Sequence, residues 1–126
     1  EFAKQLQCIT NQLVIGGRSM GGRMCTMAAS DEVDPLHVLG VACIGYPLHP
    51  PKKPDKLRTA HFGNLHNPLL FISGTRDEFG TPEELELAWK LLPKQPTVQM
   101  IEKGRHELRG ADAQVADFVA QWLQNL

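Results

Sequence analysis

Three residues of this chain carry side chains that together could cleave an acyl bond: Ser19, Asp77 and His106. A serine hydroxyl is a weak nucleophile until a neighbouring base takes its proton. A histidine titrates near neutral pH, so it can accept that proton and later return it to a leaving group. An aspartate can hold the imidazole in the required tautomer and stabilise the imidazolium. The three residue types occur in the order serine, aspartate, histidine, and each follows a predicted strand.

Ser19 lies within Gly17-Arg18-Ser19-Met20-Gly21, which fits the pattern G-x-S-x-G. The apolar run 13–15 before it predicts a buried strand, and the small residues after it predict a helix over 20–30. A serine at so sharp a turn has a strained backbone, and the flanking positions must lack side chains because the chain passes close to itself. The Met20 backbone N–H would then point at an oxyanion that forms beside the hydroxyl of Ser19.

Other interpretations of these residues stay open. A bare G-x-S-x-G also fits a glycine-rich turn between a strand and a helix. A phosphate-binding loop fits less well, because Met24 and Cys25 stand where a Lys-Ser or Lys-Thr pair would follow the last glycine. Asp77 beside Arg76 could be ion-paired, and lone histidines in loops are usually solvated. The coincidence of three residue types at three strand ends favours the catalytic interpretation.

The elements that must position these residues follow from the apolar patterns. Continuous apolar runs predict four strands, at 13–15, 38–44, 68–74 and 97–101. Helical spacing predicts helices over 1–11 and 20–30. Two further helices are predicted from their capping residues: one begins at Thr81 and has Leu92 on its apolar stripe, and the last begins at Asp112 and has Leu126 on its core face. Strands that alternate with helices predict an α/β fold with a parallel sheet of about four strands flanked by helices. Functional groups gather at the carboxyl ends of such strands, which is where Ser19, Asp77 and His106 would meet.

Residues 45–56 carry four prolines and three lysines, which excludes a helix or a central strand. A stiff surface loop at the end of a strand is predicted instead, followed by a helical turn at 57–62. Such loops line the ligand crevice of open parallel sheets. Tyr46, His49 and Met20 are therefore predicted to contact the substrate.

The composition limits the classes of function. The net charge of −1 over 126 residues does not suggest a nucleic-acid-binding protein. No apolar run approaches the roughly 20 residues that span a bilayer. The three cysteines, Cys8, Cys25 and Cys43, are widely spaced and odd in number, which argues against a disulfide framework or a zinc site. Reduced cysteines predict a cytoplasmic protein. We expect a small-molecule acyl substrate and no metal, nucleotide or flavin cofactor.

The chain resembles the α/β-hydrolase fold superfamily, and more narrowly the cofactor-free dienelactone-hydrolase-like group that includes bacterial predicted hydrolases and the animal testis-expressed protein 30. This resemblance covers the whole chain. It implies Ser19 as nucleophile, Asp77 as acid, His106 as base and the Met20 N–H as one oxyanion donor. The residues that carry it are Gly16–Gly21, Gly45-Tyr46-Pro47-Leu48-His49-Pro50, Pro68–Gly74 with Asp77, and Gly104-Arg105-His106.

The same resemblance predicts how residues 1–126 are organised. Domains of that family begin with further strands, and one loop there supplies a second oxyanion N–H. Residues 1–126 would then form a single domain that matches the C-terminal half of the fold and lacks its N-terminal strands. One missing oxyanion donor costs roughly a hundredfold or more in rate. The strand at 13–15 would become an exposed apolar edge, so we expect a homo-oligomer through this edge, a missing partner segment or poor solubility.

Two classes of function follow. The first is a serine hydrolase that cleaves an ester, thioester or related acyl bond through Ser19, Asp77 and His106. The second is a catalytically inactive α/β-hydrolase-like interaction module or fragment, because a fold does not determine a function. A third interpretation, a flavodoxin-like binding domain, predicts a phosphate at the glycine-rich turn and leaves His106 without a role.

Overall fold

The structure, a computed structural model, describes residues 2–7 and 12–126. Four parallel strands form one sheet in the order β1-β2-β3-β4. The strands are β1 (Val14–Arg18), β2 (Gly40–Ile44), β3 (Leu69–Gly74) and β4 (Thr97–Ile101). The helices are α1 (Phe2–Gln7), α2 (Met20–Ala29), α3 (Pro82–Trp89) and α4 (Asp112–Gln124), with a 3-10 turn η1 (Phe62–Asn64). The predicted α/β class with a four-stranded parallel sheet is confirmed.

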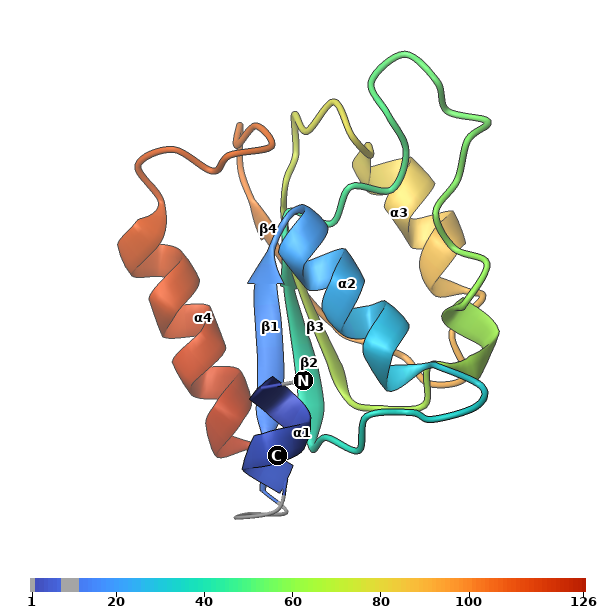
Figure 1. Cartoon of the computed structure of the whole chain (residues 1–126). Helices are drawn as coiled ribbons and strands as arrows, with labels where there is room; N and C mark the ends of the chain where they lie inside the picture. The colour runs from blue at the N-terminus through green and yellow to red at the C-terminus, as the bar shows by residue number, and fades with distance from the viewer. Residues whose placement is uncertain (1, 8–11) are drawn as a thin grey trace.

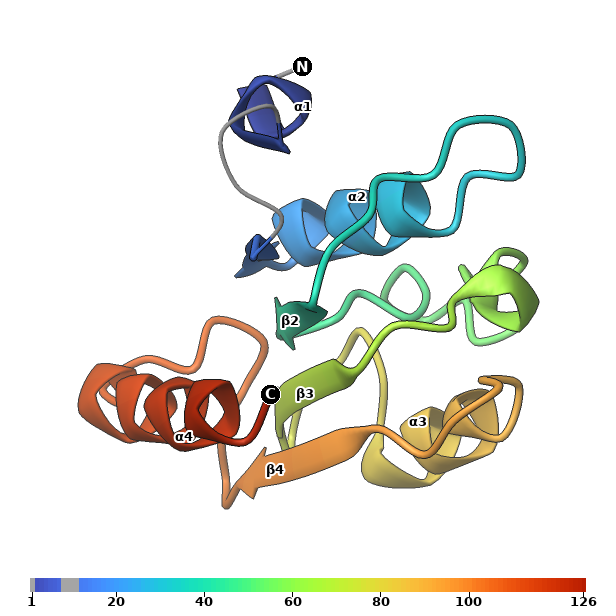
Figure 2. The ribbon, with the colours of Figure 1, turned by 90° about the horizontal axis from the view of Figure 1, so that it is seen from below.

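The sheet is covered on both faces, with α2 and α3 on one side and α4 on the other (Figures 1 and 2). Phe71 of β3 packs among the apolar residues of α2 and α3, whereas its neighbour Ile72 packs against α4. Every residue of β3 is buried, as expected for a central strand whose two faces are both covered. That double burial explains why β2 and β3 appear in the sequence as continuous apolar runs.

The boundaries of several elements differ from the predicted ones. The ladder of β2 begins at Gly40, opposite Val14, rather than at residue 38. The 3-10 turn occupies 62–64 instead of the predicted 57–62. Helix α3 begins as predicted, with Thr81 and Glu84 forming a capping box, but it ends at Trp89. The next backbone N–H groups bond three residues back, so Leu92 is still buried although it lies beyond the helix.

The prediction for the start of α4 was wrong. Ala111 occupies the cap position and Asp112 is the first helical residue, with no capping bond from a side chain. The carboxylate of Asp112 instead accepts a hydrogen bond from Arg18 at 3.1 Å, because Arg18 ends the strand beside the first turn of α4. The core face of α4 includes Val115 and Trp122 as expected, whereas Leu126 is 44% exposed and follows the helix. The predicted helix over 1–11 is α1 up to Gln7, and its remainder lies outside the described residues.

Within the described residues, β1 is one edge of the sheet, and α1 lies on the side of β1 that faces away from β2 (Figure 2). Two apolar grooves of about 340 and 350 Å³ flank β1. One is lined by Met24 and Ile15, the other by Val14 and Leu123. Across 2–7 and 12–126, no helix combines the length and the apolar character that crossing a membrane requires. Cys25 and Cys43 are free thiols, and Cys8 falls outside the described residues.

Candidate active site

Ser19 occupies a sharp turn between β1 and α2. Its backbone has φ +48° and ψ −121°, a left-handed conformation that is strained for a residue with a side chain. The backbone N–H of Ser19 donates to the carbonyl of Ile44 at 2.8 Å, which fixes the turn at the carboxyl end of β2. A Cβ atom at Gly17 would lie 2.7 Å from the carbonyl carbon of Gly21. The strand and the helix therefore approach each other too closely for a side chain at position 17.

The second steric requirement belongs to a different glycine from the one predicted. A Cβ atom at Gly21, the last glycine of the pattern, would meet nothing within 4 Å. A Cβ atom at Gly22 would lie 2.8 Å from the carbonyl oxygen of Gly17. Position 21 points away from the strand at this stage of the helix, whereas position 22 packs against it. The motif predicts that Gly21 must lack a side chain, whereas the structure places this requirement on Gly22.

Met20 is the first residue of α2. Its backbone N–H has no acceptor within the helix, since the first N–H groups of a helix lie ahead of any carbonyl they could bond. The helix N-terminus also carries a partial positive charge that favours a developing anion. The predicted oxyanion role of Met20 fits this position and stays a prediction.

The loops that carry Asp77 and His106 follow the neighbouring strands β3 and β4 and touch each other. A Cβ atom at Gly74 would lie 2.1 Å from the carbonyl oxygen of Gly104, so the two backbones are in direct contact there. The N–H of Arg76 donates to the same carbonyl of Gly104 at 2.8 Å. This close approach sets the two loops side by side at the carboxyl edge of the sheet.

The structure brings Ser19, Asp77 and His106 together in one hydrogen-bonded row. Ser19 Oγ lies 2.7 Å from His106 Nε2, and His106 Nδ1 lies 2.9 Å from Asp77 Oδ2 and 3.1 Å from Oδ1. Because Nδ1 faces a carboxylate, Nδ1 carries the proton, and Nε2 of the neutral ring is free to accept the hydrogen of Ser19. The arrangement can transfer a proton from the serine hydroxyl to the imidazole.

Burial and neighbouring charges act in opposite directions on the pKa of His106. The side chain of Asp77 is 1% exposed and that of His106 is 11% exposed. The hydrogen bond to Asp77 raises the pKa of His106 above its ordinary value of 6.5, and the charges of Asp77, Glu78 and Glu107 act in the same direction, while burial opposes them. The acid therefore favours the imidazolium that proton abstraction would produce.

One neighbour of this row was not predicted. Phe79 donates its backbone N–H to Asp77 Oδ1 at 2.8 Å, and its ring stacks on that of His106 with centroids 4.0 Å apart. In the sequence, Phe79 could have been noticed only as an aromatic residue two positions after Asp77.

The structure does not support the predicted substrate contacts of Tyr46 and His49. Tyr46 is 1% exposed, its ring packs edge-on against Phe62 and Phe71, and its hydroxyl donates to the carbonyl of Arg58. Burial raises the pKa of Tyr46 well above its ordinary range. His49 is 3% exposed and bonded to Glu84. The loop turns inward and packs against α3, so both side chains belong to the core. Met20, by contrast, is 47% exposed beside Ser19.

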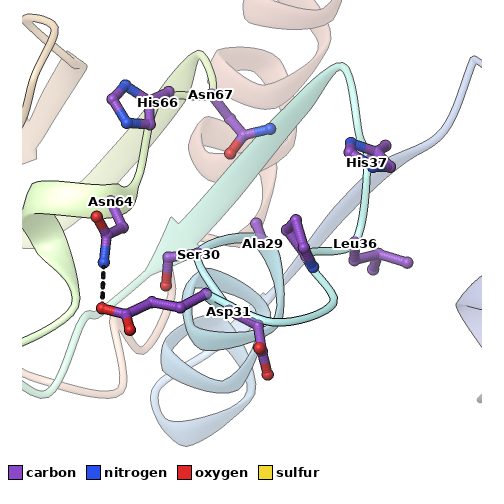
Figure 3. A pocket seen from close by; sticks show the side chains of 10 residues that line it. Ala29, Ser30, Asp31, Leu36, His37, Asn64, His66 and Asn67 are labelled. Carbon is purple, nitrogen blue, oxygen red and sulfur yellow. Dashed lines mark hydrogen bonds between the residues drawn. The ribbon is translucent and has the colours of Figure 1, made fainter.

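A separate hollow of about 410 Å³ lies at the amino edge of the sheet, among the segments that lead into β2 and β3, and Figure 3 shows the side chains that line it. Its wall includes Ser30, His37 and His66, and Asn64 bonds Glu32 across it at 3.0 Å. It is open and is lined by residues that precede the strands, whereas the hydroxyl of Ser19 lies at the carboxyl edge. Among the described residues, no group of three or more His, Cys, Asp or Glu side chains is placed to hold a metal ion.

Comparison with known proteins gives one family and one fold. Residues 1–124 match the family described as "Alpha/beta hydrolase domain". Similar solved structures include a serine hydrolase without a lid from Xanthomonas campestris, with a TM-score of 0.77 and 20% identity over 98% of this chain and 53% of that one. A dienelactone hydrolase from Anabaena variabilis has a TM-score of 0.66 and 23% identity, over 90% of this chain and 49% of that one. A monoacylglycerol lipase from Paleococcus ferrophilus has a TM-score of 0.73 and 14% identity, over 97% of this chain and 73% of that one.

At these identities the solved structures show the shared fold. The chain spans between about half and three quarters of their lengths. The matches include a dienelactone hydrolase, as the resemblance implied, and the narrower placement beside testis-expressed protein 30 stays a prediction.

Proposed function

The chain belongs to the alpha/beta hydrolase domain family, and we propose that it is a serine hydrolase that cleaves an ester, thioester or related acyl bond. In this proposal the Ser19 hydroxyl attacks the acyl carbon while His106 takes its proton. Asp77 stabilises the resulting imidazolium, and the Met20 N–H donates to the oxyanion. Protonated His106 then gives its proton to the leaving group, and water releases the acyl group from Ser19 by the same steps.

The observation that carries the proposal is the hydrogen-bonded row itself. Three residues from three loops, separated by 58 and 29 positions in the sequence, meet at 2.7 and 2.9 Å with the orientation that proton transfer requires. A solvated histidine or a turn-forming aspartate would not need a buried carboxylate aimed at one nitrogen and a strained serine at the other. The cost of the strained backbone at Ser19 also supports a functional role for that turn.

The names of similar structures also favour an acyl substrate, and the chain length between Ser19 and Asp77 favours an open site. The solved structures of similar fold are described as a monoacylglycerol lipase, a dienelactone hydrolase and a serine hydrolase without a lid. Only 57 residues separate Ser19 from Asp77, and they hold α2, β2, η1 and β3 with their connections. That leaves little chain for a large lid domain, so we propose an open site.

Reaction with a fluorophosphonate probe tests the proposal. We expect the purified chain to be labelled at Ser19, and we expect Ser19→Ala and His106→Ala to abolish labelling. Ser73→Ala is a matched control, because Ser73 is a buried serine at the end of β3 outside the row. Labelling that survives Ser19→Ala, or a folded wild-type chain that is never labelled, would refute the hydrolase proposal and favour the non-catalytic interaction module.

A further inference from the structure

Phe79 contacts both His106 and Asp77, the two residues that follow Ser19 in the hydrogen-bonded row. Its ring stacks on the imidazole of His106 with a centroid separation of 4.0 Å and an interplanar angle of 29°. Its backbone N–H donates to Asp77 Oδ1 at 2.8 Å. We propose that Phe79 is a positioning residue that sets the tilt of the His106 ring and holds the Asp77 carboxylate. This inference rests on the proposed function, because it assigns a task within the same site.

A stacked ring supplies a restraint that the hydrogen bonds do not. Nδ1 and Nε2 of His106 are each fixed along a line, toward Asp77 and toward Ser19. Neither bond prevents the imidazole from rocking about the axis that joins its two partners. A flat aromatic face at 4.0 Å opposes that motion, since rocking would drive one edge of the imidazole into the ring.

The same stack favours the charged form of the histidine. An aromatic face attracts a cation, so the contact strengthens when His106 becomes imidazolium during attack by Ser19. Other groups that act on His106 are Asp77, Glu78 and Glu107, and they are unchanged by a substitution at position 79. Loss of the ring should therefore shift the titration of His106 downward without removing its acid partner.

The backbone of Phe79 is held in place by the proline-rich loop. Its carbonyl accepts a hydrogen bond from the backbone N–H of His49 at 3.0 Å. A Cβ atom at the next residue, Gly80, would lie 3.1 Å from Cβ of Leu48, so the two loops are closely packed. The proline-rich loop thus holds the backbone of Phe79 in place.

The test compares Phe79→Leu with Phe79→Tyr, which keeps the aromatic face. Two quantities are measured: the fluorophosphonate labelling rate as a function of pH, and the titration midpoint of the His106 imidazole followed by NMR. We expect Phe79→Leu to slow labelling roughly tenfold and to lower the midpoint of His106. We expect Phe79→Tyr to retain both values. His61 lies against Phe62 rather than Phe79, so its midpoint serves as an internal reference that should not move.

Phe118→Leu is the control for a general loss of aromatic packing, because Phe118 packs with the apolar residues on the α4 side. If Phe79→Leu fails to fold, Phe79→Met takes its place with the same expectations. An unchanged His106 midpoint and labelling rate in the folded variant would overturn the inference. The NMR midpoint needs no turnover, so it decides the role of Phe79 even if the wild-type chain is not labelled and the proposed function fails.

Discussion

The imidazole of His49 faces an acceptor oxygen at each of its two nitrogens. The carbonyl of Pro50 lies 2.7 Å from Nδ1, and the carboxylate of Glu84 lies 3.0 Å from Nε2. A neutral ring has one N–H and could satisfy one of them, so the two contacts favour an imidazolium that is ion-paired to Glu84. Because Glu84 also closes the capping box with Thr81, this pair joins the proline-rich loop to the first turn of α3.

The ion pair predicts a pH-dependent stability. Burial lowers the pKa of His49, but the bonds to Glu84 and Pro50 outweigh it and hold the pKa above the ordinary 6.5, while the bond from His49 lowers the pKa of Glu84 below 4.5. The histidine's contribution is therefore complete below pH 6.5 and lost as pH rises through its raised pKa. The carboxylate's contribution is present above pH 4.5 and lost as pH falls through its lowered pKa.

We predict that His49→Gln lowers the free energy of unfolding by about 1–3 kcal/mol at weakly acidic pH, since a neutral amide cannot form the ion pair with Glu84 or donate from both positions of the imidazolium. The difference in the free energy of unfolding between this variant and the wild type should become smaller as the pH rises past the raised pKa of His49. Urea unfolding at several pH values measures it, with His66→Gln as a control at an exposed histidine. A difference that is constant with pH would contradict the assignment of an imidazolium.

Asp77→Asn should disable the site while leaving the fold in place. The amide oxygen can still accept from the Phe79 N–H, but an amide cannot stabilise the imidazolium and can donate to Nδ1, which favours the wrong tautomer. We expect the labelling rate of Ser19 to fall by roughly three to four orders of magnitude. Glu78→Gln, at the exposed carboxylate next in sequence, is the matched control and should change the rate little. Equal losses in both variants would count against a specific role for Asp77.

The pH profile of the wild-type chain gives a third prediction. Only neutral His106 can accept the proton of Ser19, and the bond to Asp77 raises the pKa of His106 above 6.5. Labelling should therefore be slow in acid and rise with pH, with a midpoint above the ordinary histidine value. The rate of inactivation by the fluorophosphonate, measured across the pH range in which the chain stays folded, gives this midpoint. A midpoint below 6.5 would mean that burial outweighs the carboxylate at His106.

The sequence was most informative where burial is complete. The strands β2 and β3 are covered on both faces, so their apolar runs predicted them closely. Ser19, Asp77 and His106 could be expected to meet because each follows a strand end, and their catalytic roles stay a prediction. Side-chain directions inside loops depend on tertiary packing, which no local pattern encodes. Tyr46 and His49 therefore looked like surface contacts although the loop buries them, and Phe79 carried no signal that tied it to His106. Asp112 resembled a cap because its partner, Arg18, lies 94 positions away.

Gly21 belongs to the G-x-S-x-G pattern, but Gly22 is the residue whose position leaves no room for a side chain. A Cβ atom at Gly21 has open space, whereas one at Gly22 would lie 2.8 Å from the carbonyl oxygen of Gly17. We predict that Gly21→Ala leaves labelling intact and stabilises the chain by up to about 1 kcal/mol, because alanine favours helix. Gly22→Ala should destabilise it by about 1–3 kcal/mol and slow labelling, since β1 and α2 must move apart. Thermal unfolding and labelling of both variants measure this, and a harmful Gly21→Ala would show that the pattern's last glycine is needed after all.

The exposed edge of β1 leads to a prediction about association. Among the described strands β1 pairs only with β2, and the short helix α1 rather than a strand lies on its other side, so its outer backbone groups have no strand partner among the described residues. The apolar grooves on its two faces hold the exposed side chains Met24 and Leu123, which are 47% and 44% exposed. We predict that two copies of the chain associate through this edge and that Met24→Glu with Leu123→Glu weakens the association, as measured by sedimentation velocity over a range of concentrations.

The control for that experiment is Leu87→Glu with Leu91→Glu, which adds the same two charges at leucines that are 65% and 54% exposed, on α3 and just after it, away from the β1 edge. Added negative charge alone would weaken association equally in both variants, because overall repulsion does not depend on where the charges lie. Loss confined to the Met24 and Leu123 variant would assign the contact to the β1 edge. A chain that stays monomeric at every concentration would rule out self-association through β1.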